Sequence, residues 1–367
     1  MQNVYKAKGN TIEKQYYDVG KLFAREINKS LTKIRLRRNA AAKIKILLAK
    51  RVLRNLNTNP LTKEFVKILE AWSFGAGISM LDATLLLADN TSGCQTVMLR
   101  YGSGVAMLHT EEDFDGIATR MTEPVIIEFT FGKKIKRTLV YNDLLPGAGL
   151  FGWETNKIVA VDSLFLSEDG LTKINKPMLA NIVAWLIWRM DPPEAEENKI
   201  MKMIVKLGLS IDGYAINVIR KVRSSYEGYK LTFTRDEGHV EWMGTEQGSY
   251  LRQVNIIDPK YHTEEVPIAR YRTEPRRMYK GGWKTFIARL WALDRLINKY
   301  KWISRERVED PLTTHIAIQN ELFGKLRPVF INDDLGATCV GLIDYQGTSA
   351  SVAVVKKSKK MKVEMFI

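Results

Sequence analysis

The sequence predicts an α+β fold, and three observations lead to this prediction. Segments rich in β-branched and aromatic residues cluster early and late in the chain, with helix-like segments between them. Hydrophobic residues make up 45% of the 367 residues, which supplies a large core and excludes a disordered chain. No internal repeat is present, and the length allows one large domain or two.

A basic segment between Lys21 and Arg54 is the first predicted element. Its apolar residues recur at helical spacing, which predicts one or two amphipathic helices ending before the turn at residues 57–60. The basic residues there, part of a net charge of +15, are opposed only by Glu26. Three interpretations are open: a solvated helix face, a patch for an anionic ligand or carrier such as coenzyme A, and a membrane or nucleic-acid surface. Nucleic acid ranks low because aromatic residues are not interleaved with the basic ones.

A β-hairpin is the next predicted element. Its strands are Val97–Tyr101 and Val105–His109, joined by a turn at residues 102–104 and followed by an acidic run at residues 111–115. This run could ligate a hard cation, but calcium-loop spacing is missing, so a solvated loop explains it better and no metal is implied. Further strands are predicted at Val125–Phe131, Arg137–Tyr141 and Ile158–Val161.

The second half of the chain mixes both element types. Periodicity predicts an apolar helix at Lys176–Met190 and an amphipathic helix from Glu194 to Leu207. It then predicts a helix from Ser210 to about Val222, a hairpin of Tyr229–Thr234 with Gly238–Met243, and an apolar helix at Thr285–Lys299. A last hairpin pairs residues 339–344 with 349–355, and a basic segment ends the chain.

Cys94 is the leading candidate for chemistry. It follows Gly93, precedes the first strand of the hairpin, and has carboxylates at the far end of the second strand. This pattern suggests an N-terminal nucleophile, in which cleavage before the cysteine frees an α-amino group that acts as its general base. Such an amine titrates at about pH 7.7–8.0, so none of the four histidines is required. The local pattern alone favours another interpretation, a buried small hydrophobe at a loop-to-strand junction.

Four blocks between Leu69 and Leu166 extend this pattern. They are EAWSFGAGIS at residues 70–79, SGCQT at 92–96, HTEEDFD at 109–115, and LLPGAGLFG at 144–152 running into KIVAVDSL at 157–164. A fifth, ATCVGLID, lies at residues 337–344. In order and spacing they resemble the peptidase C45 family, the acyl-coenzyme A:6-aminopenicillanic acid acyltransferase-like family of N-terminal-nucleophile hydrolases.

The resemblance implies a fold, an activity and a set of site residues. It implies a four-layer αββα sandwich, cut between Gly93 and Cys94 into fragments 1–93 and 94–367 that stay associated in one compact domain. The activity implied is that of an amidohydrolase or acyltransferase without a cofactor, forming a thioester on Cys94. Its substrate would be a small-molecule, non-peptide amide or an acyl donor such as a coenzyme A thioester. Asp113 would support catalysis, and Trp153 and Arg276 would contact the substrate.

Two residues depart from the family pattern. Thr110 stands where the family has Asn, and where related hydrolases have an Arg, so we assign it to substrate binding. Asp162 stands where the family offers an Asn to the oxyanion hole, whose donors typically supply about 2.7–4 kcal/mol. An ionised Asp162 would repel the oxyanion, and only a protonated one could donate to it. These departures keep open an alternative function, a non-catalytic member of the fold that acts as a binding or partner protein.

The location follows from what the sequence lacks. The first residues carry no apolar stretch typical of a signal peptide, and the longest apolar run, Met178–Trp188, is too short to span a bilayer. The two cysteines, Cys94 and Cys339, do not suggest a disulfide framework. We therefore expect a cytoplasmic protein with no transmembrane segment.

Overall fold

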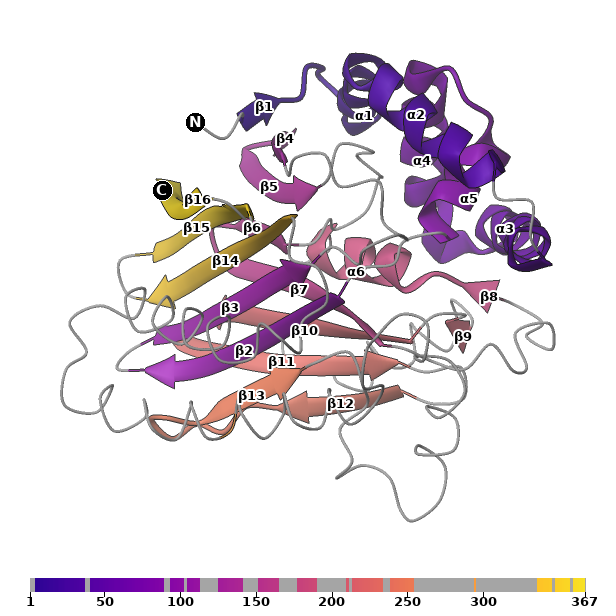
Figure 1. The fold of residues 1–367 in the computed structure, drawn as a ribbon. Helices are drawn as coiled ribbons and strands as arrows, with labels where there is room; N and C mark the ends of the chain where they lie inside the picture. The colour runs from indigo at the N-terminus through magenta and orange to yellow at the C-terminus, as the bar shows by residue number, and fades with distance from the viewer. Residues whose placement is uncertain are drawn as a thin grey trace, which may run out of the picture.

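The computed structural model describes residues 4–36, 40–88, 93–101, 104–112, 125–140, 151–164, 177–189, 209–210, 213–233, 238–253, 294, 335–344, 347–356 and 359–366. These residues form a group of helices and two large β-sheets, which lie as successive layers (Figure 1), and a third sheet of two short strands. The predicted mixture of helices and sheets is confirmed, whereas the complete four-layer sandwich stays a prediction.

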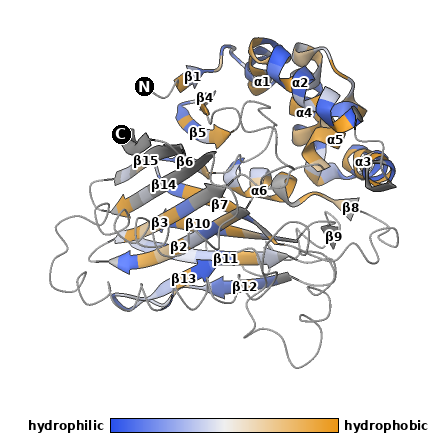
Figure 2. Cartoon of the chain, viewed as in Figure 1, coloured by the Kyte–Doolittle hydropathy of each residue, from blue (hydrophilic) through white to orange (hydrophobic). Residues whose placement is uncertain are grey.

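The helices come mostly from the N-terminal quarter of the chain. They are α1 (Ile12–Leu22), α2 (Ala24–Leu36), α3 (Ala40–Thr58), the 3-10 turn η1 (Pro60–Thr62), α4 (Lys63–Ala76), α5 (Met80–Ala88) and, much later, α6 (Ala180–Arg189). The basic amphipathic helices are confirmed, and α3 continues through Asn57 and Thr58, two residues into the predicted turn at 57–60. Hydrophilic and hydrophobic residues mix along α1 to α4 (Figure 2), because one face of each helix is buried and the other is solvated.

Among the described residues, no single helix combines the length and the apolar character needed to cross a membrane. The segments Pro60–Ala76 and Met80–Ala88 meet the apolar criterion only as a pair, across a bend of 105°. Gly77 ends the first of them in the left-handed conformation, with φ of 67°, which only glycine adopts easily. Most of the apolar side chains of both segments are buried.

One sheet has eight strands, in the order β1-β4-β5-β6-β7-β10-β11-β12. Their bounds are Val4–Lys6, Val125–Phe131, Lys134–Val140, Phe151–Glu154, Lys157–Leu164, Gly213–Val222, Ser225–Phe233 and Gly238–Trp242. All neighbours are antiparallel except β1 and β4. Two short strands, β8 (Pro177–Met178) and β9 (Leu209–Ser210), form a separate parallel pair.

The other sheet has six strands, in the order β13-β2-β3-β14-β15-β16. Their bounds are Tyr250–Gln253, Gly93–Tyr101, Gly104–Glu112, Leu335–Asp344, Gly347–Lys356 and Lys359–Phe366. All neighbours are antiparallel, and β2 lies inside the sheet between β13 and β3. Both predicted hairpins of this sheet are confirmed.

Two hydrophobic cores hold the layers together. On β7, Val159 and Val161 belong to the core under the helices, whereas Ile158 and Ala160 belong to the core between the sheets. Because side chains alternate along a strand, the eight-stranded sheet is buried on both faces here. Met98 and Met107 reach the second core from the six-stranded sheet. The two sheets therefore pack face to face, and the helices cover the opposite face of the eight-stranded one.

The prediction of a helix from Ser210 to about Val222 is wrong. Residues 213–222 form strand β10, paired with β7 on one side and β11 on the other. Tyr214, Ile216 and Val218 face the helices, and Ile219 lies in the core between the sheets. A strand that is buried on both faces loses the polar alternation that marks a half-buried strand, so its apolar run imitates a helix.

Other predicted segments have different outcomes. The basic C-terminal segment contributes strand β16, which the sequence did not indicate. The hairpin of β11 with β12 is confirmed. The apolar helix predicted at Lys176–Met190 is confirmed over Ala180–Arg189 as α6, whereas Pro177 and Met178 form β8. The helix predicted at residues 194–207 lies outside the described residues, as does that at 285–299 apart from Asp294.

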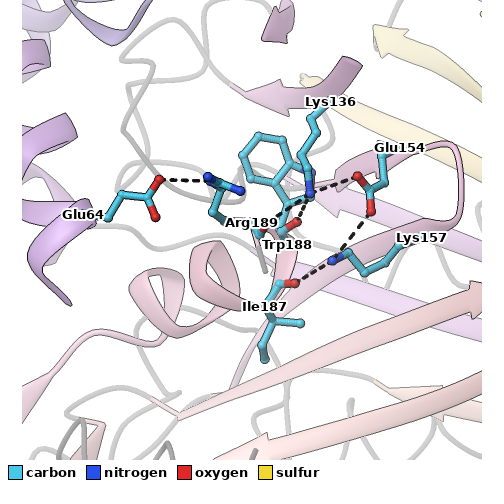
Figure 3. Close-up of polar contacts among 7 residues, drawn as sticks. All are labelled: Glu64, Lys136, Glu154, Lys157, Ile187, Trp188 and Arg189. Atoms are coloured by element: carbon cyan, nitrogen blue, oxygen red, sulfur yellow. Dashed lines mark hydrogen bonds and ion pairs between the residues drawn. The ribbon is translucent and has the colours of Figure 1, made fainter. Parts of the chain in front are cut away.

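A buried ionic network fixes the C-terminal end of α6 to the eight-stranded sheet (Figure 3). Lys136 of β5 donates to the carbonyls of Trp188 and Arg189 at 2.8 and 3.2 Å, and Lys157 of β7 donates to that of Ile187 at 2.9 Å. Glu154 lies 2.9 Å from Lys136 and 3.8 Å from Lys157. Cationic side chains near a helix C-terminus donate hydrogen bonds to its last carbonyls and interact favourably with the negative end of its dipole. The network therefore caps α6.

Candidate active site

Cys94 is the second residue of β2, and its side chain is 1% exposed. Further along the same strand, Met98 lies in the core between the sheets, and Thr96 contacts Asp162 of the opposite sheet. Residues two apart on a strand share a face. Cys94 therefore faces the eight-stranded sheet, and the Gly93–Cys94 bond lies at the start of a strand inside the molecule.

The register of β2 with β3 defines the neighbours of Cys94. Cys94 pairs with Glu111, and Thr96 pairs with His109. Strand β3 ends at Glu112, so Asp113, the predicted supporting carboxylate, lies outside the described residues. Among the described carboxylate residues of β3, Glu111 is the one placed opposite Cys94.

Four buried polar residues, the Thr96 cluster, lie between the sheets beside Cys94. The cluster comprises Thr96 of β2, His109 of β3, Asp162 of β7 and Asn217 of β10, each at most 1% exposed. The Thr96 hydroxyl is 2.8 Å from Nδ1 of His109 and 2.7 Å from Oδ2 of Asp162. Asn217 donates to the same Oδ2 at 2.5 Å, and Oδ1 of Asp162 is 3.8 Å from His109 Nδ1.

The number of hydrogens that each group can donate determines the direction of these hydrogen bonds. A threonine hydroxyl carries one hydrogen, and here it is donated to Asp162. The contact between Thr96 and His109 is therefore satisfied when His109 Nδ1 carries a proton and donates it. One carboxylate oxygen that accepts from both Thr96 and Asn217 is typical of an ionised carboxylate.

Burying the polar groups of the cluster has an energetic cost. Among the described residues, Oδ1 of Asn217 is buried without a hydrogen-bond partner. Leaving such a group unsatisfied costs about 1–3 kcal/mol, and a buried charge costs more unless it is paired. Apolar residues such as Met98, Ile158 and Ile219 occupy the same inter-sheet layer at lower cost. A polar group kept here against that cost is typical of a functional site.

The predicted site residues are only partly brought together. Gly93, Cys94 and Asp162 lie in the same region, on facing strands. Thr110 lies on β3, in register with Gln95. Trp153 is 3% exposed in the core between the sheets, 5.8 Å from the ring of Phe151, so these contacts are those of a core residue. Arg276 lies outside the described residues.

Three residues of the cluster were missed in the sequence. Thr96 and His109 are polar residues at inward positions of otherwise apolar strands, and Asn217 interrupts the apolar run from Tyr214 to Ile219. That interruption was a usable signal, because a buried strand rarely accepts an amide without a partner. Reading residues 210–222 as a helix concealed it.

Other candidate sites among the described residues have less support than the region around Cys94. A pocket of about 420 Å³ lies between the start of α1 and the β4–β5 turn, lined by residues such as Thr11, Lys134 and Arg189, and it does not include Cys94. No group of three or more potential metal ligands occurs in the described part of the chain.

Neither a scan against models of protein families nor a search of curated proteins finds a match to this chain.

Proposed function

We propose that this protein is a self-processing amidohydrolase or acyltransferase with Cys94 as an N-terminal nucleophile. One observation carries the proposal: the Gly93–Cys94 bond begins an internal strand, and Cys94 shares a buried face of that strand with Thr96, which belongs to a polar cluster between two stacked sheets. Cleavage there would leave the new α-amino group attached to the carbon that bears the thiol side chain. That amine can take the thiol proton in each later reaction cycle.

The chemistry that follows is acyl transfer through a thioester. The thiolate would attack the carbonyl of a small amide or acyl donor, and the leaving group would depart with a proton from the α-amino group. Water then gives hydrolysis and an amine gives transfer, so both activities share one acyl-enzyme. Cys94 forms the covalent bond, and groups around it must stabilise the oxyanion.

The four-layer αββα sandwich belongs to this proposal, and two observations support its fourth layer. Val97 and Leu99, on the face of β2 turned away from the eight-stranded sheet, are 2% and 4% exposed. Asp294, a helical residue, pairs with Arg252 and Tyr250 of β13. Leu251 faces the core between the sheets, so Arg252 and Tyr250 lie on the outer face. A helix packed on that face would complete the sandwich.

Self-cleavage is the test. Purified protein should give two fragments, residues 1–93 and 94–367, on a denaturing gel and by intact-mass spectrometry. Cys94→Ala should give one intact, folded chain. As a control, Cys339→Ala leaves the proposed nucleophile in place and should cleave as the wild type does. Wild-type protein that is fully folded yet uncut would overturn the proposal.

The alternative is a non-catalytic member of the fold that acts as a binding or partner protein. The hydrogen bonding of Asp162 favours it, because Oδ2 accepts from two donors and is not available as an oxyanion donor. The same gel decides between the two, since a chain without chemistry stays intact. Alkylation adds a second criterion: a native protein whose Cys94 resists iodoacetamide favours the partner protein.

A further inference from the structure

Self-cleavage poses a problem that the mature enzyme does not have. In the intact chain the nitrogen of Cys94 is part of the peptide bond to Gly93, and an amide nitrogen is not a base. The α-amino group exists only after the bond is broken. A thiol must lose its proton to become a nucleophile, so the first cleavage needs another proton acceptor.

His109 is a titratable group near Cys94 whose ring orientation is defined by the contacts with Thr96 and Asp162. Its register partner is Thr96, which makes His109 a diagonal neighbour of Cys94 across the pair β2–β3. Diagonal neighbours are about 7–8 Å apart between α-carbons, within reach of a ring side chain. The contact of His109 with Thr96 places its ring on the face that Cys94 shares.

The cluster also orients the ring. Nδ1 of His109 donates to Thr96, which donates to Asp162, at 2.8 and 2.7 Å. Nε2 is then the basic atom of the ring. A histidine whose one nitrogen is held by a carboxylate serves as a general base through the other, and the carboxylate stabilises the cation that forms. Here the hydroxyl of Thr96 relays that interaction, and Oδ1 of Asp162 lies only 3.8 Å from Nδ1.

We propose that His109, oriented by Thr96 and Asp162, is the general base for self-cleavage of the intact chain. The α-amino group of Cys94 takes over once it is released. This inference rests on the proposed function, and it assigns Thr96 and Asp162 as positioning residues. The buried cluster would thus act in self-cleavage, and the reaction of the mature enzyme would not depend on it.

The step balances as follows. Nε2 of His109 takes the thiol proton, and the sulfur attacks the carbonyl carbon of Gly93. A carbon–sulfur bond forms, the carbon–nitrogen bond breaks, and the departing nitrogen receives the proton back from His109 as it becomes an amine. Water then hydrolyses the thioester, which yields the Gly93 carboxylate and the free thiol of Cys94. His109 is neutral again at the end.

The surroundings of His109 determine the pH dependence. Asp162 faces it from β7, Cys339 is its register partner on β14, and Glu111 follows two residues later on β3. Phe151 of β6 stacks on its ring at 6.3 Å, and it carries no charge. A protonated His109 does not accept the thiol proton, so the cleavage rate should rise with pH as the imidazole loses its proton. A variant without the imidazole should lose that part of the profile.

The experiment follows cleavage of newly translated full-length chain by intact-mass spectrometry across a range of pH. His109→Gln keeps a hydrogen-bond donor but accepts no proton, and should slow cleavage about 100-fold or more. Thr96→Val should slow it at least about tenfold, and Thr96→Ser should restore most of the rate. His239→Gln and Thr84→Val make the same chemical changes outside the cluster and should cleave as the wild type does. Folding of every variant is checked by circular dichroism.

A second readout separates maturation from general damage. On long incubation His109→Gln should still yield mature protein, whose Cys94 should react with iodoacetamide at the wild-type rate because the α-amino group now serves it. If the wild type cleaves and a folded His109→Gln variant cleaves equally fast, His109 is not the general base for self-cleavage. The proposed function would still stand. An uncut wild-type chain overturns both. Slow alkylation of mature His109→Gln would contradict the division of roles.

Discussion

Asp162 accepts hydrogen bonds from two donors, one on the opposite sheet and one on the neighbouring strand. Thr96 reaches it from the six-stranded sheet, and Asn217 reaches it from β10 beside it. The carboxylate thereby joins both sheets at a point where the surrounding side chains are apolar. Its charge has one basic group close by, His109, among the described residues of the cluster. Two roles compete for it, that of counter-ion to His109 and that of an oxyanion residue.

Asp162→Asn distinguishes these roles. An asparagine still accepts hydrogen bonds from Thr96 and Asn217, so the melting temperature should change little. It removes the counter-ion of a protonated His109, so self-cleavage should slow about tenfold or more, an effect of about 1.4 kcal/mol on the barrier. Cleavage kinetics and thermal melting on one preparation provide the measurement.

The control for this variant is Asp82→Asn, which makes the same change far from the cluster. Burial favours the neutral form of Asp82, but hydrogen bonds from Ser79 and Arg35 outweigh it and hold the pKa of Asp82 below its ordinary value. Its loss should lower stability without slowing cleavage. Faster cleavage or acylation in Asp162→Asn would instead support an oxyanion residue weakened by its charge.

At the scale of elements, two glycines set how closely α1 and α4 approach. A β-carbon at Gly20 would lie 2.2 Å from the carbonyl oxygen of Trp72, and one at Gly75 would lie 2.2 Å from that of Tyr17. Each helix thus presents a glycine to the backbone of the other. The GAG run at residues 75–77, which the sequence resemblance picked out, supplies one of these glycines and also the left-handed Gly77 that ends α4.

Gly75→Ala should therefore destabilise the helical layer. The added methyl group forces the helices apart, and overpacking of this kind typically costs about 1–3 kcal/mol. Chemical denaturation of the full chain measures the loss, and Gly20→Ala should behave alike. Gly77→Asn is the control, because no atom lies within 4 Å of a β-carbon there and Asn tolerates the left-handed conformation. A Gly75→Ala variant as stable as the wild type would mean that the helices adjust freely.

At the scale of the whole molecule, the helices of residues 1–93 depend on the rest of the chain. Tyr16 stacks on Phe129 and accepts a hydrogen bond from Trp185, and Gln15 bonds to the backbone of Thr130. The core under the helices contains residues from both sides of the predicted cleavage point. The link between Glu64 and Arg189 adds an ion pair at the rim, partly exposed to solvent (Figure 3).

After cleavage the two fragments should therefore remain associated. Apolar contacts are not screened by salt, so gel filtration in about 1 M NaCl should still show one species. Guanidinium should separate the fragments. Glu64→Gln should leave the association intact, because an exposed ion pair contributes only about 0–1 kcal/mol. Dissociation in high salt would show that charge rather than apolar burial holds the fragments.

The sequence by itself determined the local elements. Periodicity placed the basic helices, the hairpin around residues 102–104 and the final hairpin, because each depends on neighbours in sequence. Periodicity did not single out Gly93, Cys94 and Asp162, which became candidates through the local motif and the family resemblance. It failed at residues 213–222, where burial on both faces removes the alternation that identifies a strand.

Only the tertiary structure decided which polar residues meet. Thr96 and Asp162 are 66 positions apart, and Asn217 lies 55 positions beyond Asp162. Their contact depends on the stacking of two sheets and on strand register, which no local pattern encodes. A shift of one residue in β2 would turn both Cys94 and Thr96 away from the second sheet. The sequence determined that a nucleophile candidate stands at residue 94, and tertiary packing decided that a histidine and a carboxylate meet at Thr96, two residues further along the same strand.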